Sequence, residues 1–195
     1  MVNKIMATET KSLLCDVKNS CLMIVDVQEK LSAVMPEKVI NRLKTNTDVL
    51  LTAANQLKIP VITTMQYPKG LGGIENFVKD KLNETSKCFE KTSFSSLEAE
   101  GLEDHLKELD KKQIILMGLE SHICVLQTAI EFTEKGYDVF VVSDAIASRK
   151  LTSYETALIR LEQAGVWLLN TESVLFEWLR DASHPDFKAL SKLIL

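Results

Sequence analysis

A cysteine, an aspartate and a lysine stand where a nucleophilic site could form. Cys124 lies between an apolar stretch, residues 114–117, and a segment with helical periodicity. That position predicts a thiol at a strand-to-helix turn, where the free N–H groups and the positive end of the helix favour the thiolate. Asp26 directly follows another apolar run, and Lys91 ends a short extended segment. Together these residue types indicate cysteine-based nucleophilic chemistry.

Each of these side chains also has an ordinary structural explanation. A free cysteine commonly packs as a small apolar side chain, an aspartate at a strand end commonly caps a loop, and most lysines are solvated. An acid that directly follows five apolar residues is costly to bury alone, so we expect Asp26 to face a cation or a thiol.

If Cys124 is an activated thiol and Asp26 its partner, an electrophilic probe should label Cys124 before Cys15, Cys21 and Cys88. The labelling should slow down when Asp26 is changed to Asn.

The histidines and glycines do not indicate a metal or phosphate site. His105, His122 and His184 lack the spacing of metal ligands. His122 could pair with Cys124 in principle, but residues two apart at a helix start point in different directions, so we expect a structural role. The Gly-rich segment 66–73 lacks the G-K-[ST] ending of a phosphate loop and is expected to be a pocket wall or lid.

Apolar runs that alternate with helical patterns must position these residues. Strands are predicted over residues 21–25, 61–64, 87–91, 113–117, 139–142 and 166–169, and helices over 36–57, 125–136, 152–164, 172–180, 185–193 and from residue 95 onward. This alternation predicts a three-layer, doubly wound parallel α/β sheet of about six strands in the order 3-2-1-4-5-6, with helices on both faces. Ligands bind such sheets at the carboxyl ends of the first and fourth strands, so we expect Asp26 and Cys124 at one crevice.

Length and composition predict one domain. The chain has 195 residues, of which 46% are hydrophobic and 26% charged, so we expect a single domain over residues 19–195 after a loose tail over residues 1–18. The net charge of −4 and the lack of a basic, aromatic-rich block disfavour nucleic acid as a partner. No apolar run approaches the ~20 residues needed to cross a bilayer, so no membrane partner is expected.

The four cysteines lack a C-x-x-C pair, and no signal-peptide pattern precedes them. Reduced thiols and a cytoplasmic location are therefore expected. An organelle-targeting role for the N-terminal tail stays open.

Three segments resemble the isochorismatase-like cysteine hydrolase superfamily. They are residues 25–28 (VDVQ), 89–94 (FEKTSF) and 118–125 (GLESHICV). More narrowly, residues 66–72 (QYPKGLG), 143–145 (SDA) with Ser148 and Arg149, and 181–187 (DASHPDF) resemble its isochorismatase domain-containing branch. The resemblance extends over residues 21–193, nearly the whole predicted domain.

The resemblance implies a catalytic triad of Asp26, Lys91 and Cys124. Asp26 would be the general base, Lys91 would hold the aspartate and support the thiolate, and Cys124 would form a thioester-type covalent intermediate. The N–H groups of Glu120 and Cys124 would form the oxyanion hole after a cis peptide at Leu119–Glu120. The substrate-binding side chains would be Gln28, Leu31, Gln66, Tyr67 and Glu120.

Departures from the superfamily narrow the expected reaction. The Asp-x-His element of metal-containing nicotinamidases is missing after the second strand, so neither a metal, another cofactor nor nicotinamidase activity is expected. Isochorismatases that cleave a vinyl ether lack the nucleophilic cysteine. Cys124 therefore favours hydrolysis of an amide-like or carbamoyl-like C–N bond in a small molecule, by a homo-oligomeric protein. The alternative is an oligomeric interaction module with little or no catalysis, and a nuclease is disfavoured by the acidic charge.

Overall fold

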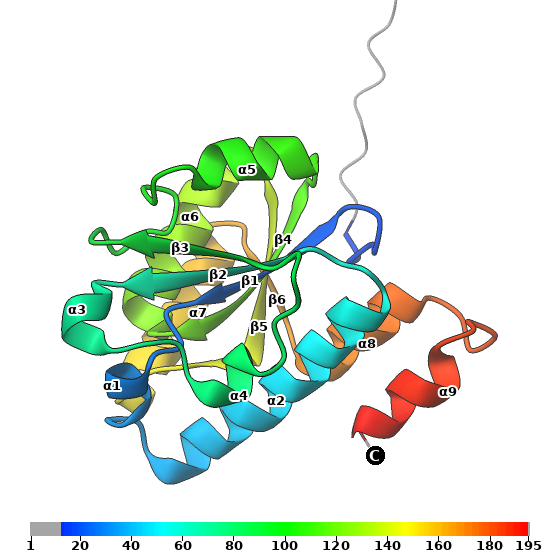
Figure 1. Cartoon of the computed structure of the whole chain (residues 1–195), viewed down its shortest axis with the longest axis horizontal. Coiled ribbons are helices and arrows are strands. Elements are labelled where there is room, and N and C mark those ends of the chain that lie inside the picture. The colour runs from blue at the N-terminus through cyan, green and yellow to red at the C-terminus, as the bar shows by residue number, and fades with distance from the viewer. Residues whose placement is uncertain (1–12, 195) are drawn as a thin grey trace, which may run out of the picture.

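Apolar side chains cover both faces of β1 (Ser20–Val25), in which every residue is buried. A strand buried on both faces belongs in the interior of a parallel sheet. In the computed structural model, which describes residues 13–194, β1 pairs in parallel with β2 (Val61–Gln66) and β4 (Gln113–Leu119). The described residues form a six-stranded sheet in the order β3-β2-β1-β4-β5-β6 (Figure 1), which confirms the predicted fold.

The remaining strands are also parallel to their neighbours. They are β3 (Lys87–Lys91), β5 (Asp138–Ala147) and β6 (Trp167–Leu169). The helices are α1 (Glu29–Ser32), α2 (Glu37–Gln56), α3 (Pro68–Leu71), α4 (Asn76–Lys79), α5 (Leu102–Leu109), α6 (Leu126–Glu134), α7 (Leu151–Gln163), α8 (Thr171–Leu179) and α9 (Phe187–Leu190). A π-helical turn, η1 (Ser121–Val125), joins β4 to α6, and a 3-10 turn, η2 (Ser191–Ile194), follows α9.

Two apolar cores lie on opposite faces of the sheet because neighbouring side chains of a strand point in opposite directions. Leu22 and Ile24 of β1 belong to one core, whereas Met23 and Val25 belong to the other. The first core is covered by α2 and α8, and the second by α5, α6 and α7. Figure 1 shows α2 and α8 below the sheet and α5 above it.

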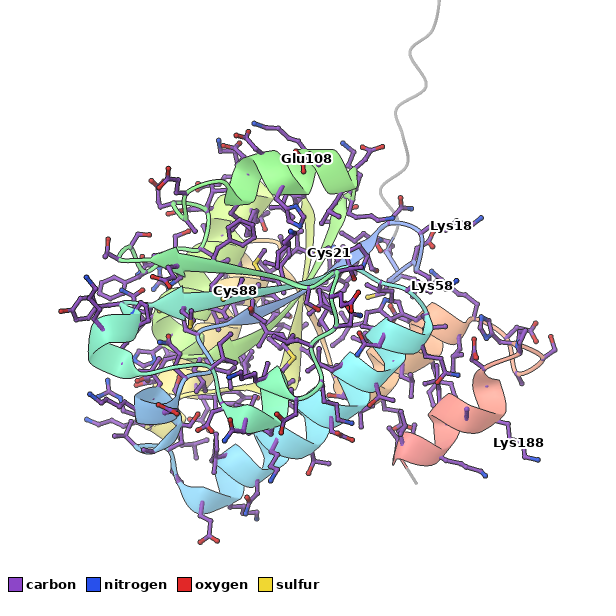
Figure 2. The ribbon with its side chains drawn as sticks, in the orientation of Figure 1. Lys18, Cys21, Lys58, Cys88, Glu108 and Lys188 are labelled. Carbon is purple, nitrogen blue, oxygen red and sulfur yellow. The ribbon has the colours of Figure 1, made fainter. Side chains whose placement is uncertain are left out.

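Many charged side chains of the outer helices point away from these cores. Figure 2 shows Glu108 on the outer side of α5 and Lys188 on α9 extending into solvent. In the part of the chain that the structure describes, no helix is both long and apolar enough to cross a membrane.

Several predicted elements differ from the structure. The helix expected over residues 185–193 is the short α9 followed by the 3-10 turn η2. β5 continues past Asp144 to Ala147, because Ile146 and Ala147 pair with the end of β4 after a register shift. The helix expected from residue 95 begins at Leu102 instead, since the serines at 95 and 96 hold a turn: Ser95 Oγ accepts a hydrogen bond from the Leu97 N–H. The segment 66–73, for which no helix was predicted, contains the short helix α3.

Most of the predicted loose tail, residues 1–12, lies outside the described residues. Its last part is packed against the end of α8. Cys15 is fully buried, its N–H donates to Glu177 Oε2 at 2.7 Å, and its carbonyl accepts from Arg180 Nη2 at 2.8 Å. The packed part of the chain therefore begins before residue 19.

Candidate active site

Asp26 lies at the carboxyl end of β1 with both carboxylate oxygens engaged. Its backbone has φ of 51°, in the left-handed region, where aspartate is tolerated better than most residues. The side chain is fully buried; Thr64 Oγ1 donates to Oδ1 at 2.7 Å and Lys91 Nζ donates to Oδ2 at 2.6 Å. The buried charge thus has a cationic partner, as expected for an acid that follows an apolar strand.

Lys91 is the last residue of β3, and its side chain is fully buried. Besides Asp26, its ammonium donates to Gln66 Oε1 at 2.9 Å. The carbonyl oxygens of Ser93 and Phe94 accept at 3.2 and 3.1 Å. A buried ammonium is tolerated only with such compensation, so these acceptors hold Lys91 at one position beside Asp26.

Cys124 is the fourth residue of η1 and only 6% exposed. Its thiol lies within hydrogen-bond reach of the Asp26 carboxylate and of the Glu120 N–H. Burial, followed by the charge of Asp26, raises the pKa of Cys124 to about 12, although Lys91 and the Glu120 N–H act in the opposite direction. The expectation of a resting thiolate is therefore wrong: desolvation and a neighbouring carboxylate outweigh the helix end. At neutral pH the sulfur carries its proton and needs a base to lose it.

Gly118 lets β4 approach β1 at the point where the site forms. Its φ is +125°, and a Cβ atom there would lie 2.1 Å from the carbonyl oxygen of Val25. A side chain at this position would push apart the two strands that lead to Asp26 and to η1. Glycine is therefore required by both the backbone conformation and the close contact.

Glu120 begins the turn after β4, and its peptide bond with Leu119 is cis. The carboxylate is nearly buried and pairs with Arg149 Nε at 2.6 Å. Its second oxygen lies 3.5 Å from His122 Nδ1. A hydrogen bond from the Glu120 N–H to the sulfur lowers the pKa of Cys124.

Gln28 and Gln66 are occupied by the protein's own polar groups. The Gln28 amide donates to the carbonyl oxygens of Gln66 at 3.1 Å and Gly72 at 2.8 Å, and its oxygen accepts from the Gln66 N–H at 2.8 Å. The Gln66 side chain contacts Lys91 and donates to the Thr92 carbonyl at 2.6 Å. Both residues therefore position the segment 66–72 and Lys91, and their role in substrate binding stays a prediction.

Leu31 and Tyr67, the other predicted pocket residues, follow β1 and β2, the strands that end at the site. Leu31 packs against the core that contains Val27 and Met35. Tyr67 is 53% exposed, and its ring lies against Gly70. Thr64, which the sequence reasoning did not single out, is a buried hydroxyl in an apolar strand next to Asp26, and that contrast is the signal that could have identified it.

The histidines do not contact the Cys124 sulfur in any described interaction. His122 Nδ1 lies 2.9 Å from Ser148 Oγ, and His105 packs on Phe89. Within residues 13–194, no group of three or more His, Cys, Asp and Glu side chains is arranged to hold a metal ion.

The other three cysteines lie away from these partners. Burial raises the pKa of Cys21, on β1, to about 12, and burial also raises the pKa of Cys15 and of Cys88. Cys88 is exposed on the edge strand β3, and Figure 2 labels it together with Cys21. Of the four thiols, Cys124 is the one that is hydrogen-bonded to Asp26, whose other oxygen holds Lys91, whereas Cys15 lies beside the carboxylate of Glu177.

A family model and two similar proteins indicate the same family for this chain. A model of the isochorismatase domain matches residues 20–173. Isochorismatase family protein 1B of Dictyostelium discoideum is 39% identical over 177 residues, which cover 89% of this chain and 84% of that protein. Isochorismatase domain-containing protein 2 of Danio rerio is 40% identical over 178 residues, which cover 91% and 87%.

Solved structures share the fold. The MAR1 ribonuclease of Caenorhabditis elegans superposes with a TM-score of 0.87 at 38% identity, over 93% of this chain and 92% of that one. YcaC of Pseudomonas aeruginosa, solved with hexane-2,5-diol and covalent acrylamide, gives 0.87 at 25% identity over 95% and 94%. The YcaC product of Escherichia coli, described as an octameric hydrolase of unknown specificity, gives 0.85 at 25% over 94% and 90%.

Proposed function

Since this chain belongs to the isochorismatase family of hydrolases, as its motifs predict, we propose that it is a metal-independent cysteine hydrolase of small amide-like or carbamoyl-like C–N bonds. One observation carries the proposal: the Cys124 thiol lies against the Asp26 carboxylate, whose other oxygen holds Lys91. This arrangement supplies a nucleophile, a base and a counter-ion in one buried place.

In the first step, Asp26 accepts the thiol proton while the sulfur attacks the carbonyl carbon, and the C=O electron pair moves to the oxygen. When that pair returns, the C–N bond breaks and the nitrogen leaves with the proton that Asp26 had taken. A water molecule then attacks the thioester-type intermediate and gives its proton to Asp26. Release of the acid product returns that proton to the sulfur, so protons balance over the cycle.

The raised pKa of Cys124 fits this order of events. A protonated thiol has to be deprotonated as it attacks, so the general base contributes to the rate itself. Lys91 limits the cost of the negative charge that moves between carboxylate and sulfur. The N–H groups of Glu120 and Cys124 are the proposed donors to the oxyanion, and one such donor contributes on the order of 3 kcal/mol.

A small substrate is supported by the burial of the reacting groups. Asp26 and Lys91 have fully buried side chains, and Cys124 is almost covered. The similar YcaC of Pseudomonas aeruginosa carries covalent acrylamide, an amide-bearing electrophile. Acrylamide reacts with thiolates, so this chain's Cys124 is expected to react with it as well.

A screen of small amides, ureas and carbamoyl compounds, followed by ammonia or amine release, tests the proposal with Cys124→Ala as control. We expect the wild type to release amine and Cys124→Ala to lose at least about 100-fold of the rate while keeping its melting temperature. Activity that survives in Cys124→Ala would rule out the cysteine mechanism. No activity in either protein would favour the interaction-module alternative.

A second candidate, RNA hydrolysis, rests on the similarity to the MAR1 ribonuclease of Caenorhabditis elegans. The net charge of −4 and the buried reacting groups give it less support than C–N hydrolysis. RNA cleavage by the wild type that is lost in Cys124→Ala would favour this candidate.

A further inference from the structure

The Glu120 carboxylate is held by groups that the proposed mechanism does not use. Its side chain is 6% exposed, and Oε1 lies 2.6 Å from Arg149 Nε. Oε2 accepts from the Arg149 backbone N–H at 3.5 Å and lies 3.5 Å from His122 Nδ1, which in turn lies 2.9 Å from Ser148 Oγ. A nearly buried carboxylate needs such a cation, so Arg149 is the principal partner of Glu120.

The unexpected length of β5 brings these groups together. Leu119 of β4 pairs with Ala147 of β5, so the residues that follow each strand, Glu120 on one and Ser148 with Arg149 on the other, leave the sheet side by side. Had β5 ended at Asp144, Arg149 would lie in a loop with no fixed relation to η1. The sheet register thus places the guanidinium beside the carboxylate.

The backbone of Glu120 reaches the nucleophile directly. Its N–H contacts the sulfur of Cys124, and its carbonyl oxygen accepts hydrogen bonds from Ile123 at 3.1 Å and Val125 at 3.2 Å. Glu120 is thus fixed at three points: its side chain by Arg149, its carbonyl by η1, and its N–H on the sulfur. Loss of the ion pair removes one of these three anchors, so we expect the N–H to shift relative to the sulfur.

We propose that Arg149 is a positioning residue for Cys124, which acts through its ion pair with Glu120 to hold the Glu120 N–H on the sulfur. As a statement about hydrolysis this rests on the proposed function, but the contact with the thiol exists without substrate. The competing explanation is that the pair only stabilises the fold. Because both explanations allow some loss of stability when Arg149 is replaced, the effect on the thiol is the feature that separates them.

The test compares Arg149→Gln with Lys150→Gln, which removes the same charge from the neighbouring exposed residue. Alkylation of Cys124 by iodoacetamide is followed over a range of pH by mass spectrometry of its peptide. We expect Arg149→Gln to shift the alkylation profile to higher pH and slow the reaction by roughly 3- to 10-fold, because the N–H lowers the thiol pKa. Lys150→Gln should match the wild type. Asp26 and Lys91, the charged groups that face the sulfur, are unchanged in both variants.

Kinetics on a substrate found in the amide screen gives the second readout. A displaced oxyanion donor should lower kcat by roughly 10- to 100-fold and change KM by less than about twofold. Because Arg149 acts through Glu120, the double variant Glu120→Gln/Arg149→Gln should be no slower than the worse of its single variants. Arg149→Lys should recover only part of the rate, since an ammonium keeps the charge but not the planar geometry.

An Arg149→Gln protein with a lower melting temperature but a wild-type alkylation profile would overturn the proposal and show a structural role. Additive losses in the double variant would also overturn it. If Arg149→Gln does not fold, Arg149→Lys is judged by the same alkylation criterion. If the wild type hydrolyses none of the substrates, the proposed function fails while the alkylation profiles still decide whether Arg149 positions the thiol.

Discussion

At the residue scale, Asp26 has opposite effects on the thiol at rest and during reaction. Its negative charge and its hydrogen bond keep the proton on Cys124, whereas the same carboxylate is the group that can accept the proton when the sulfur attacks. Lys91 keeps the aspartate at contact distance through the 2.6 Å ion pair. Thiol reactivity and hydrolysis are therefore expected to respond differently to a change at this position.

Asp26→Asn should accelerate the alkylation of Cys124 and suppress hydrolysis. Removal of the carboxylate charge lowers the thiol pKa from its raised value, so the pH profile of alkylation should move to lower pH. At a fixed pH below the wild-type pKa, each unit by which the thiol pKa falls should raise the alkylation rate roughly tenfold. Hydrolysis should fall by at least about 100-fold because the base is gone. Peptide mass spectrometry and amine release measure the two effects.

The structure thereby reverses the expectation that Asp26→Asn would slow labelling. Asp144→Asn is a suitable control, since Asp144 also accepts hydrogen bonds but its partner is Thr171. Alkylation that slows in Asp26→Asn, with a melting temperature like that of the wild type, would contradict the electrostatic reasoning.

At the element scale, three strand ends and one turn build the site. Asp26 follows β1, Gln66 ends β2, Lys91 ends β3, and Cys124 lies in the turn after β4. Parallel strands end on the same edge, so residues far apart in sequence meet there. The close approach of β1 and β4 at Gly118 determines how near the thiol comes to the carboxylate.

Gly118→Ala should destabilise the protein by on the order of 3 kcal/mol or more, because its Cβ would lie 2.1 Å from a backbone oxygen that cannot move freely. Gly136→Ala is the matched control: Gly136 also has a positive φ, +88°, but nothing lies within 4 Å of the added Cβ. Its cost should be only the conformational one, about 1 kcal/mol. Chemical denaturation measures the free energy of unfolding of both variants. Equal losses in the two would contradict the prediction that the close contact at Gly118 adds to the cost.

Gln28→Ala should loosen the segment 66–72 and, through Gln66, the position of Lys91. The change removes the partner of the Gln66 N–H and of two carbonyl oxygens, at a cost of about 2 kcal/mol. Hydrogen exchange should rise in this segment. Gln56→Ala, which removes an exposed amide bonded to Asp186, is the control. Unchanged exchange in the Gln28 variant would show that Gln28 does not hold the segment.

At the scale of the whole molecule, the edge that carries the site also carries exposed apolar side chains. Val34, Tyr67, Phe94 and Leu151 follow β1, β2, β3 and β5 and are each more than half exposed. Apolar side chains gathered on one side of a protein often mark an interface. A similar YcaC structure is described as an octameric hydrolase.

We therefore expect a homo-oligomer, whose native mass is a multiple of 21.9 kDa. Native mass spectrometry or light scattering measures it, and Phe94→Ser combined with Leu151→Ser should lower the mass by weakening contacts between copies. Control changes on the two helical layers, Ile159→Ser on α7 and Phe176→Ser on α8, should leave the mass unchanged. A monomer at all accessible concentrations would contradict the prediction.

The fold was predictable because it depends on local periodicity. Apolar runs such as β1 are buried on both faces, and that property alone favours a parallel sheet with alternating helices. The strand order and the residues at the strand ends follow from general rules of such sheets. Their positions at the ends of elements placed Asp26 and Cys124 at one crevice, whereas the resemblance to the family added Lys91 as the third member of the predicted triad.

Properties that depend on distances between distant segments were decided only by the tertiary structure. The protonation of Cys124 follows from burial and from contact with Asp26, which no local pattern contains. The length of β5, which pairs Arg149 with Glu120, depends on a register shift against β4. Gln28 proved to hold backbone groups because its amide is buried among them. Sequence patterns describe each element by itself, whereas electrostatics and hydrogen bonding depend on which elements become neighbours.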